Sequence, residues 1–321
     1  MTAEPAKDSR RVVLVIPTYN AAAEWPRLIA GIRSQRLQPK SILVIDSSSS
    51  DGTAEVARAS GCRVETIAQH EFSHGGTRQM ALKLEPEAEF LVYLTQDAAF
   101  ADPDALVNLL EYFSEPSVAI VYGRQLPRPE AGAIEAHARL FNYPAQSQIR
   151  SLDDRARYGI KTIFCSNSFA AYRRAALEEA GGFPDRLIHG EDTVVAARVL
   201  LHRHRVAYAA EARVFHSHSY SFMQEFRRYF DTGVLHRREA WLQSSFGTAG
   251  GEGRRFIFSE LRQVLRHAPW LLPVLPLRTA AKLAGYRLGL SEHRIPAWLK
   301  PRLSMNRSFW QSEAANPEQK L

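Results

Sequence analysis

Short apolar runs alternate with helix-like segments from residue 12 to residue 122, and this alternation constrains the fold more than any other feature of the chain. The runs are rich in Val, Ile and Leu, which is typical of strands buried on both faces of a parallel sheet. The pattern therefore predicts an α/β fold, with a mostly parallel sheet flanked by helices. The expected strands are 12–16, 41–45, 64–67, 90–94 and 118–122, and the expected helices are 22–36, 53–60, 76–84 and 103–113.

The pattern is less regular after residue 123. Residues 124–160 are rich in Pro and Arg and predict a loop or an inserted segment. An apolar run at 164–172 predicts another strand, although Ser166, Asn167 and Ser168 are polar. Further expected elements are a turn at 181–184, a helix from 191 to about 202, and short strands at 206–209 and 212–215.

The C-terminal third has a different character. Phe222, Phe226 and Phe230 recur at helical spacing in a basic segment, and residues 247–253 have the composition of a linker. Basic amphipathic helices interrupted by prolines are expected from Phe256 onward. The sequence thus predicts an α/β domain over 1–235 and a basic helical C-terminal region over 236–321.

Composition excludes several classes of protein. Of the 321 residues, 45% are hydrophobic and 23% are charged, which is ordinary for a globular chain rather than a disordered one. The two cysteines, Cys62 and Cys165, exclude a Cys-based zinc site or a disulfide framework and fit a reducing cytoplasm. The polar segment Met1–Arg11 lacks the apolar stretch of a signal peptide. No run approaches the roughly 18 apolar residues of a membrane-spanning helix.

Polar side chains follow the expected strands at the point where each strand ends. Asp46 and Asp97 follow two of them, and Thr18 to Asn20 follow the first. Ligands of parallel α/β sheets bind at the carboxyl ends of the strands. We therefore expect a ligand site along this edge.

An ordered set of motifs resembles the GT-A glycosyltransferases of family 2, and most closely the bacterial rhamnosyltransferases of surface-polysaccharide assembly. Each motif is weak alone, but six in order over about residues 12–235 are specific. They are Val-Ile-Pro-Thr-Tyr-Asn at 15–20, Val-Ile-Asp-Ser at 44–47 with Asp-Gly-Thr at 51–53, Phe-Ser-His-Gly-Gly-Thr-Arg at 72–78, Leu-Thr-Gln-Asp-Ala at 94–98, Gly-Glu-Asp at 190–192 and His-Ser-His at 216–218.

The resemblance implies a GT-A fold and a nucleotide-sugar site along the strand ends. In it the Asp46 carboxylate would accept a hydrogen bond from a pyrimidine N3–H, although an Asp before Ser47 could also simply shape the turn. The backbone N–H groups of Gly75 and Gly76, and the side chain of Arg78, would approach the donor phosphates. Alternatively, the two glycines would form only a flexible loop. The residues expected to bind the donor are Pro17, Thr18, Tyr19, Asn20, Asp46, His74, Gly75, Arg78, Gln96 and Asp97.

The resemblance also implies a divalent metal ion, Mg²⁺ or Mn²⁺, which would assist departure of the nucleotide diphosphate. Family members commonly carry Asp-x-Asp where this chain has Thr95-Gln96-Asp97, so only the second carboxylate remains. His216 is expected to complete the metal site with Asp97, and its nitrogen ligand would favour Mn²⁺. His216 and His218 alternate, so both point to one face if they lie on a strand.

Glu191 and Asp192 occupy the family position of the general base. Asp192 would remove the proton of the acceptor hydroxyl, with Glu191 as its structural neighbour, and the two roles could be exchanged. Both carboxylates could instead only favour a helix N-terminus electrostatically.

Together these motifs imply an inverting glycosyltransferase that moves L-rhamnose from dTDP-L-rhamnose to a lipid-linked or lipopolysaccharide glycan precursor. A UDP- or GDP-linked hexose donor is the alternative within the class. A nucleotidyltransferase, a Rossmann oxidoreductase and a non-catalytic membrane scaffold are alternatives outside it. The first strand is not followed by the Gly-x-Gly-x-x-Gly of dinucleotide-binding folds, which argues against the oxidoreductase.

Basic residues concentrate in the C-terminal third. Residues 1–200 contain 22 Lys and Arg against 25 Asp and Glu, whereas residues 201–310 contain 18 against 7. No nucleic-acid-binding module accompanies this charge, so nucleic acid is not expected as a partner. A solvated basic face is one interpretation. The other is peripheral attachment to an anionic membrane, at the inner face of the cytoplasmic membrane. In the second case the apolar run 270–277 would be flanked by Arg262, Arg266, Arg278 and Lys282.

Overall fold

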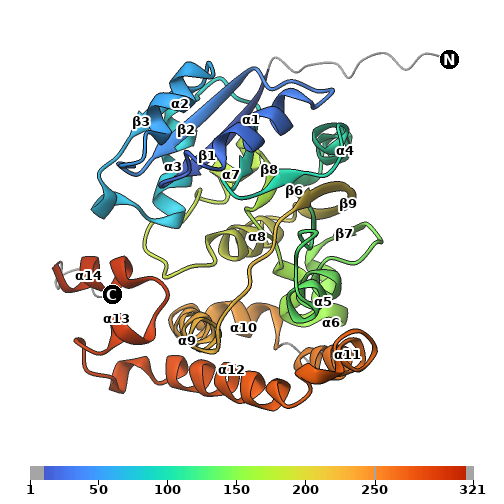
Figure 1. The fold of residues 1–321 in the computed structure, drawn as a ribbon. Helices are drawn as coiled ribbons and strands as arrows, with labels where there is room; N and C mark the ends of the chain where they lie inside the picture. The colour runs from blue at the N-terminus through green and yellow to red at the C-terminus, as the bar shows by residue number, and fades with distance from the viewer. Residues whose placement is uncertain (1–10, 249–250, 316–321) are drawn as a thin grey trace.

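The computed structural model describes residues 11–248 and 251–315. The polar N-terminal segment, in which no signal peptide is expected, lies outside these ranges except for Arg11, and so do residues 249–250 of the expected linker. A nine-stranded sheet forms the centre of the fold (Figure 1), in the order β3-β2-β1-β4-β8-β6-β9-β5, with β7 paired to β9. The strands are β1 (Val12–Thr18), β2 (Ser41–Asp46), β3 (Arg63–Thr66), β4 (Phe90–Leu94), β5 (Ala99–Phe100), β6 (Val118–Leu126), β7 (Gln148–Arg150), β8 (Phe169–Arg173) and β9 (Arg205–Phe215).

Alternate side chains of the strands face two separate apolar clusters, one on each face of the sheet. Leu14 and Ile16 of β1 face one cluster, whereas Val13 and Val15 face the other. The first cluster is covered by α1 (Trp25–Arg33), α2 (Thr53–Ala59) and α4 (Ala105–Leu110), and the second by α3 (His74–Leu84), α7 (Arg174–Glu179) and α8 (Glu191–Leu201). The predicted α/β architecture is confirmed.

The sheet is mixed in direction. Strands β1 to β4, β6 and β9 run one way, and β5, β7 and β8 run the other. Because β8 is antiparallel to its neighbours β4 and β6, its first residue lies at the edge where those two strands end. This places the loop 164–168 at the carboxyl edge of the parallel strands.

Several local predictions were wrong. The segment 124–160 is not an irregular loop, because it contains the end of β6, helix α5 (Ala133–Asn142), strand β7 and helix α6 (Arg155–Tyr158). The strand expected at 164–172 begins only at Phe169, where the polar residues before it end. The two short strands expected at 206–209 and 212–215 form one strand, β9, which shifts register against β6 between Gly123 and Arg124.

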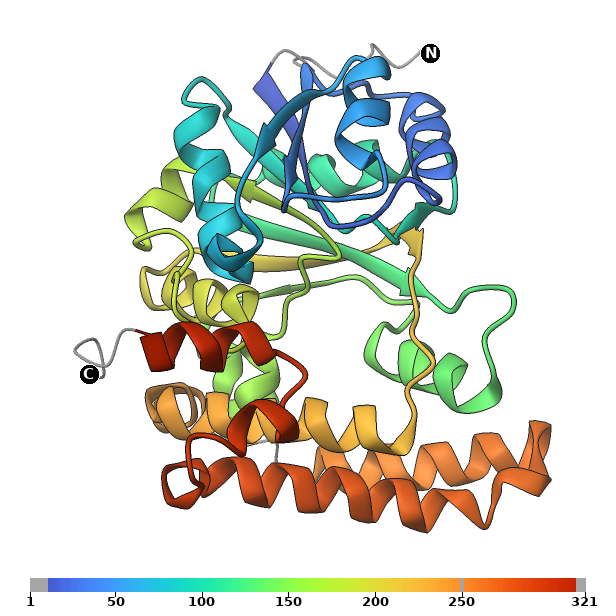
Figure 2. The same ribbon diagram turned by 60° about the vertical axis from the view of Figure 1, so that its left-hand side comes forward.

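Beyond β9 the chain is helical and forms a layer beside the sheet (Figure 2). Its helices are α9 (Phe222–Arg238), α10 (Ala240–Phe246), α11 (Glu252–His267), α12 (Val274–Leu290), α13 (Lys300–Leu303) and α14 (Arg307–Ala315). Short 3₁₀ turns occur at η2 (Gln69–Glu71), η3 (Glu111–Ser114), η4 (Leu152–Asp154), η5 (Gly159–Ile163), η6 (Pro269–Leu271) and η7 (Glu292–Arg294). The boundary expected at residue 235 falls inside α9. Within the described ranges, no helix combines the length and apolarity needed to cross a membrane.

Glycines allow α9 and α12 to pack with their backbones in contact. A Cβ atom at Gly285 would lie 2.2 Å from the carbonyl oxygen of Phe226, and one at Gly289 would lie 2.1 Å from that of Phe230. On α9, a Cβ at Gly233 would lie 2.3 Å from the carbonyl oxygen of Tyr286. Atoms at such distances overlap, so only glycine fits these positions. The close packing holds α9 firmly against α12.

Candidate active site

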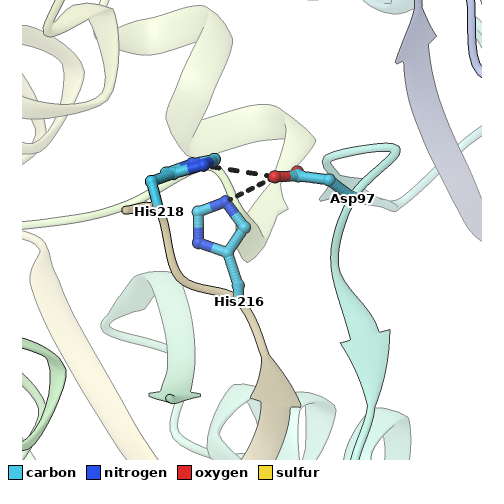
Figure 3. Close-up of side chains that lie close together, drawn as sticks. All are labelled: Asp97, His216 and His218. Atoms are coloured by element: carbon cyan, nitrogen blue, oxygen red, sulfur yellow. Dashed lines mark ion pairs between the residues drawn. The ribbon is translucent and has the colours of Figure 1, made fainter. Parts of the chain in front are cut away.

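Three side chains that could bind a metal ion meet at the carboxyl edge of the sheet (Figure 3). Asp97 lies in the loop after β4, and His216 and His218 follow the end of β9. The Nε2 atoms of His216 and His218 lie 3.3 Å and 3.6 Å from the Oδ2 atom of Asp97. One carboxylate oxygen and two imidazole nitrogens thus converge on one point, as the ligands of a divalent ion would.

The orientation of His216 is set by strand β6. Its backbone N–H donates to the carbonyl oxygen of Leu126, and its Nδ1 atom lies 2.9 Å from Oε1 of Gln125. Gln125 is itself held, because it accepts a hydrogen bond from Arg139 and donates one to Ser166. An imidazole whose Nδ1–H is held by an acceptor presents the Nε2 lone pair to a metal, as is usual for histidine ligands.

The electrostatics of the cluster also suit a cation. Burial tends to raise the pKa of Asp97, but the neighbouring His216, His218 and Thr95 together outweigh it and hold the pKa well below its usual range. Burial, together with His216, lowers the pKa of His218 to about 4. At neutral pH the carboxylate is therefore charged, and His218 is neutral with a lone pair to offer. These donors fit a divalent metal ion.

A pair of carboxylates lies at the first turn of α8. Glu191 is buried, its Oε1 atom lies 3.1 Å from Nη1 of Arg78, and it accepts a hydrogen bond from Nδ2 of Asn167. Asp192 accepts hydrogen bonds from the backbone N–H groups of Asn167 and Thr193. No cation within ion-pair distance of Asp192 is found among the residues that the structure describes.

The two carboxyl groups differ in proton affinity. Burial would raise the pKa of Glu191, but the charge of Arg78, together with His74 and the hydrogen bond from Asn167, outweighs it and lowers that pKa. The pKa of Asp192 is raised well above its usual range, first by burial and second by the negative charge of Glu191. A carboxylate with a raised pKa accepts a proton more readily, so Asp192 is the better general base of the two.

One cleft of about 500 Å³ contains both groups of residues. Asp97, His216 and His218 line it from the sheet edge, and Glu191 and Asp192 line it from α8. A candidate general base and a candidate metal centre thus face the same space. This arrangement suits the transfer of a group between a metal-bound leaving group and a hydroxyl.

The expected nucleotide residues lie at the ends of β1, β2 and β4. Asp46 is buried and accepts hydrogen bonds from the Thr18 hydroxyl and from the backbone and hydroxyl of Ser49. The carboxamide of Gln96 accepts from the Tyr19 backbone N–H and donates to the Tyr19 carbonyl. The Thr18–Asn20 loop is thereby tied both to Asp46 and to the loop that carries Asp97. Asp46 shapes its turn, and its contact with a pyrimidine remains a prediction.

Comparison with known proteins identifies the family. The model of glycosyl transferase family 2 matches residues 13–181. O-antigen chain rhamnosyltransferase RfbN of Salmonella typhimurium is 45% identical over 301 residues, which are 94% of this chain and 96% of the relative. The chain belongs to glycosyl transferase family 2. A second relative, O-antigen chain rhamnosyltransferase WbaN of Salmonella anatum, is 46% identical over 298 residues, covering 92% of this chain and 95% of the relative.

Solved structures agree with the GT-A fold. Mannosyltransferase PcManGT from Pyrobaculum calidifontis, solved in complex with GDP-Man and Mn²⁺, superposes with a TM-score of 0.55 at 20% identity, covering 98% of this chain and 89% of that one. A fragment of S. aureus TarS in complex with UDP-GlcNAc gives 0.52 at 16% identity, covering 88% and 91%. These neighbours show the fold. Family membership makes the chain a glycosyltransferase and sets aside the nucleotidyltransferase, oxidoreductase and scaffold alternatives.

In this family 2 glycosyltransferase the His-Gly-Gly segment has a packing role that the sequence did not reveal. A Cβ at Gly75 would lie 1.7 Å from the carbonyl oxygen of Pro184, and Gly76 N–H donates to Ser73, which caps α3. His74 and Arg78 line the cleft, but Gly75 does not. Arg78 contacts Glu191 instead of standing free for phosphate. Phosphate binding by this segment remains a prediction, and the glycines have a structural reason of their own.

Two residues of the site were missed by sequence reasoning. His218 joins the metal cluster with His216, and their alternation was the signal that could have included it. Asn167 bridges the carboxylates of Glu191 and Asp192 and accepts a hydrogen bond from the Tyr172 hydroxyl. The three polar residues 166–168 within an otherwise apolar segment were a signal as well. Which carboxylates Asn167 contacts could be learned only from the fold.

Proposed function

We propose that this glycosyltransferase transfers L-rhamnose from dTDP-L-rhamnose, with inversion, to a hydroxyl of a lipid-linked O-antigen-type glycan precursor. The observation that carries the proposal is the cleft in which Asp192 faces the cluster of Asp97, His216 and His218. The names of two relatives at 45% and 46% identity over nearly the whole chain support rhamnose as the sugar.

The donor would lie along the carboxyl ends of β1, β2 and β4, with its diphosphate toward Asp97. A divalent ion held by Asp97, His216 and His218 would supply positive charge where the leaving diphosphate accumulates negative charge. The two imidazole ligands favour Mn²⁺ over Mg²⁺, which prefers an all-oxygen environment. Through its two hydrogen bonds to Tyr19, Gln96 would hold the Thr18–Asn20 loop at a fixed position relative to Asp97.

The acceptor hydroxyl would meet Asp192. The raised pKa of this carboxyl lets it take the proton as the hydroxyl attacks the anomeric carbon, on the side opposite the leaving nucleotide. Glu191 acts on the reaction through Asp192, because its negative charge raises the pKa of Asp192. Arg78 keeps Glu191 itself ionised. Asn167 holds both carboxylates at a fixed separation.

A panel of nucleotide sugars tests the donor assignment. We expect slow, Mn²⁺-stimulated hydrolysis of dTDP-L-rhamnose that exceeds hydrolysis of UDP-glucose and GDP-mannose by about tenfold or more, because a site built for one donor aligns it for attack. Released dTDP, UDP and GDP are quantified by chromatography, and the Asp97→Asn protein provides the background. Faster hydrolysis of a UDP- or GDP-hexose would contradict the proposal and favour the alternative donor.

The structure revises the expected membrane contact. Arg278 and Lys282 are not surface charges, because both lie within ion-pair distance of Glu225 and their side chains are 15% and 14% exposed. Exposed apolar side chains do remain on α11 and η6, beside the exposed Arg262 and Arg266. They are Ile257, Phe258, Leu261, Leu265 and Trp270. We propose that these side chains of α11 and η6 attach the protein to an anionic membrane surface.

Vesicle cosedimentation tests this attachment. Changing Arg262→Gln and Arg266→Gln together should weaken binding to phosphatidylglycerol vesicles about 30-fold, at roughly 1 kcal/mol for each basic residue. Binding of the unchanged protein should also fall with rising salt. The charge-matched control, Arg27→Gln with Arg58→Gln on α1 and α2, should bind as the unchanged protein does. Equal binding to neutral and anionic vesicles, or none at any salt, would favour a solvated basic face.

A further inference from the structure

Helix α9 presents a polar stripe to the cleft that contains Asp192. Arg228, Thr232 and His236 are spaced four residues apart, so they lie on one face of the helix, and all three line the cleft. The face that carries Gly233 packs against α12. The stripe is therefore held in place by the close contact of the two helices, and α9 forms a rigid wall of the cleft.

This wall contacts the turn that carries the catalytic carboxylates. Gly190 has φ +81° and precedes Glu191, and a Cβ at that position would lie 2.7 Å from Cδ2 of Leu235. Leu235 therefore packs directly on the turn from which α8 begins. Because one helix both touches this turn and lines the cleft, its polar side chains face whatever molecule approaches Asp192.

Arg228 is the residue of the stripe that is suited to an anion. Its side chain is exposed to the cleft, lies over the ring of Tyr220 and donates to the Tyr220 hydroxyl at 3.3 Å. Among the described residues no carboxylate forms an ion pair with it, whereas Arg238 of the same helix pairs with Glu292 and Glu313. An exposed guanidinium without a carboxylate partner is a ready site for phosphate oxygens.

Facing the stripe, His189 offers an unused polar atom. Its Nε2 atom is buried and has no hydrogen-bond partner in the described structure, and the residue lines the cleft. Burial, with a contribution from Arg228, lowers the pKa of His189 to about 3, so the ring is neutral at physiological pH. A buried polar atom without a partner is costly, and a ligand hydroxyl would satisfy it.

We propose that the α9 stripe and His189 form the acceptor subsite, in which Arg228 binds a phosphate group of the acceptor and His189 binds a hydroxyl of its sugar. The inference rests on the proposed function for the identity of the reaction. It adds the residues that bind the acceptor, and it requires that the acceptor glycan carry phosphate between its sugar and its lipid. Arg228 and Asp192 line the same cleft, so the phosphate lies close to the sugar that is modified.

Acceptor binding can be measured without the donor, which separates this inference from the donor assignment. Two soluble acceptors carry the same sugar, one on a short-chain lipid diphosphate and one on an uncharged alkyl chain. Arg228→Gln should weaken calorimetric binding of the diphosphate acceptor about 10- to 100-fold and leave that of the uncharged one unchanged. Arg228→Lys should restore part of the loss. The matched control is Arg237→Gln, an exposed arginine of α9 that does not line the cleft.

Binding of the donor nucleotide tests whether Arg228 instead contacts the donor diphosphate. The affinity for dTDP with Mn²⁺ should be the same in Arg228→Gln as in the unchanged protein. A fall in dTDP affinity would overturn the inference and assign Arg228 to the donor diphosphate. Equal losses for the two acceptors, or no loss for either, would overturn it as well. Failure of the unchanged protein to hydrolyse dTDP-L-rhamnose would instead contradict the proposed function, while the acceptor titration would still decide the subsite.

Discussion

Asp97→Asn is expected to abolish sugar transfer, with a loss of about 10³-fold or more, while leaving the fold intact. Among the described residues, Asp97 supplies the one carboxylate of the candidate metal centre, beside His216 and His218, and the substitution removes its charge. Without the ion, the charge that develops on the leaving diphosphate is no longer stabilised, and losses of this order follow when such electrostatic contacts are removed. The amide has nearly the same shape as the carboxylate, so packing around Asp97 should change little.

Calorimetric titration with dTDP, with and without Mn²⁺, separates this effect from a general loss of structure. The unchanged protein should bind dTDP more tightly with Mn²⁺ than without it, and the variant should lose that difference. Asp104→Asn is the matched control, because Asp104 forms an ion pair with Arg36 at the surface and is absent from the cleft. An unchanged gain from Mn²⁺ in Asp97→Asn would reject Asp97 as a metal ligand.

Asp192→Asn is expected to slow transfer by about 10²- to 10⁴-fold, the usual cost of losing a general base. Donor affinity should stay near that of the unchanged protein, because a base acts on the acceptor. Glu191→Gln serves as the comparison. It leaves Arg78 buried without its carboxylate partner, so it should lower stability as well as activity.

The pH dependence provides a second measure of the same role. The base must be deprotonated to act. We therefore expect kcat/KM to be low at pH values below the pKa of Asp192 and to rise as the pH increases through that pKa. Because burial and Glu191 raise that pKa, the acid limb should lie well above the ordinary carboxyl value of about 4. Arg78 and His74 lower the pKa of the neighbouring Glu191 and so keep it charged. They therefore affect the position of the acid limb through the charge of Glu191. If Asp192→Asn keeps more than about a tenth of kcat while chemistry limits the rate, Glu191 becomes the first candidate for the base.

The sequence by itself determined the α/β core and the edge at which the site lies. Strands β1, β2, β4 and β6 are continuous apolar runs, and such a run is a local property that needs no knowledge of its partners. Asp46 and Asp97 follow strand ends in the sequence, so their place at the carboxyl edge follows from the rule that parallel strands end together.

Tertiary structure alone decided which polar groups meet. The antiparallel direction of β8 brings Asn167 to Glu191 and Asp192, and a strand's direction depends on its neighbours rather than on its own residues. The pairing of Arg78 with Glu191 likewise joins α3 to α8 across a long separation in sequence. Such contacts carry no local periodicity, so no pattern along the chain could indicate them.

The C-terminal helices show the same limit for charge. Helical spacing placed Arg278 and Lys282 among basic residues that could face a membrane, because charge and periodicity can be read from sequence. Whether a basic side chain faces solvent or a carboxylate depends on the helix packed against it. Close contact of α9 with α12, through Gly285 and Gly289, brings Glu225 to both cations and removes them from the surface. Arg228 lies on the opposite side of that packing and lines the cleft with Asp192, and no carboxylate among the described residues forms an ion pair with it.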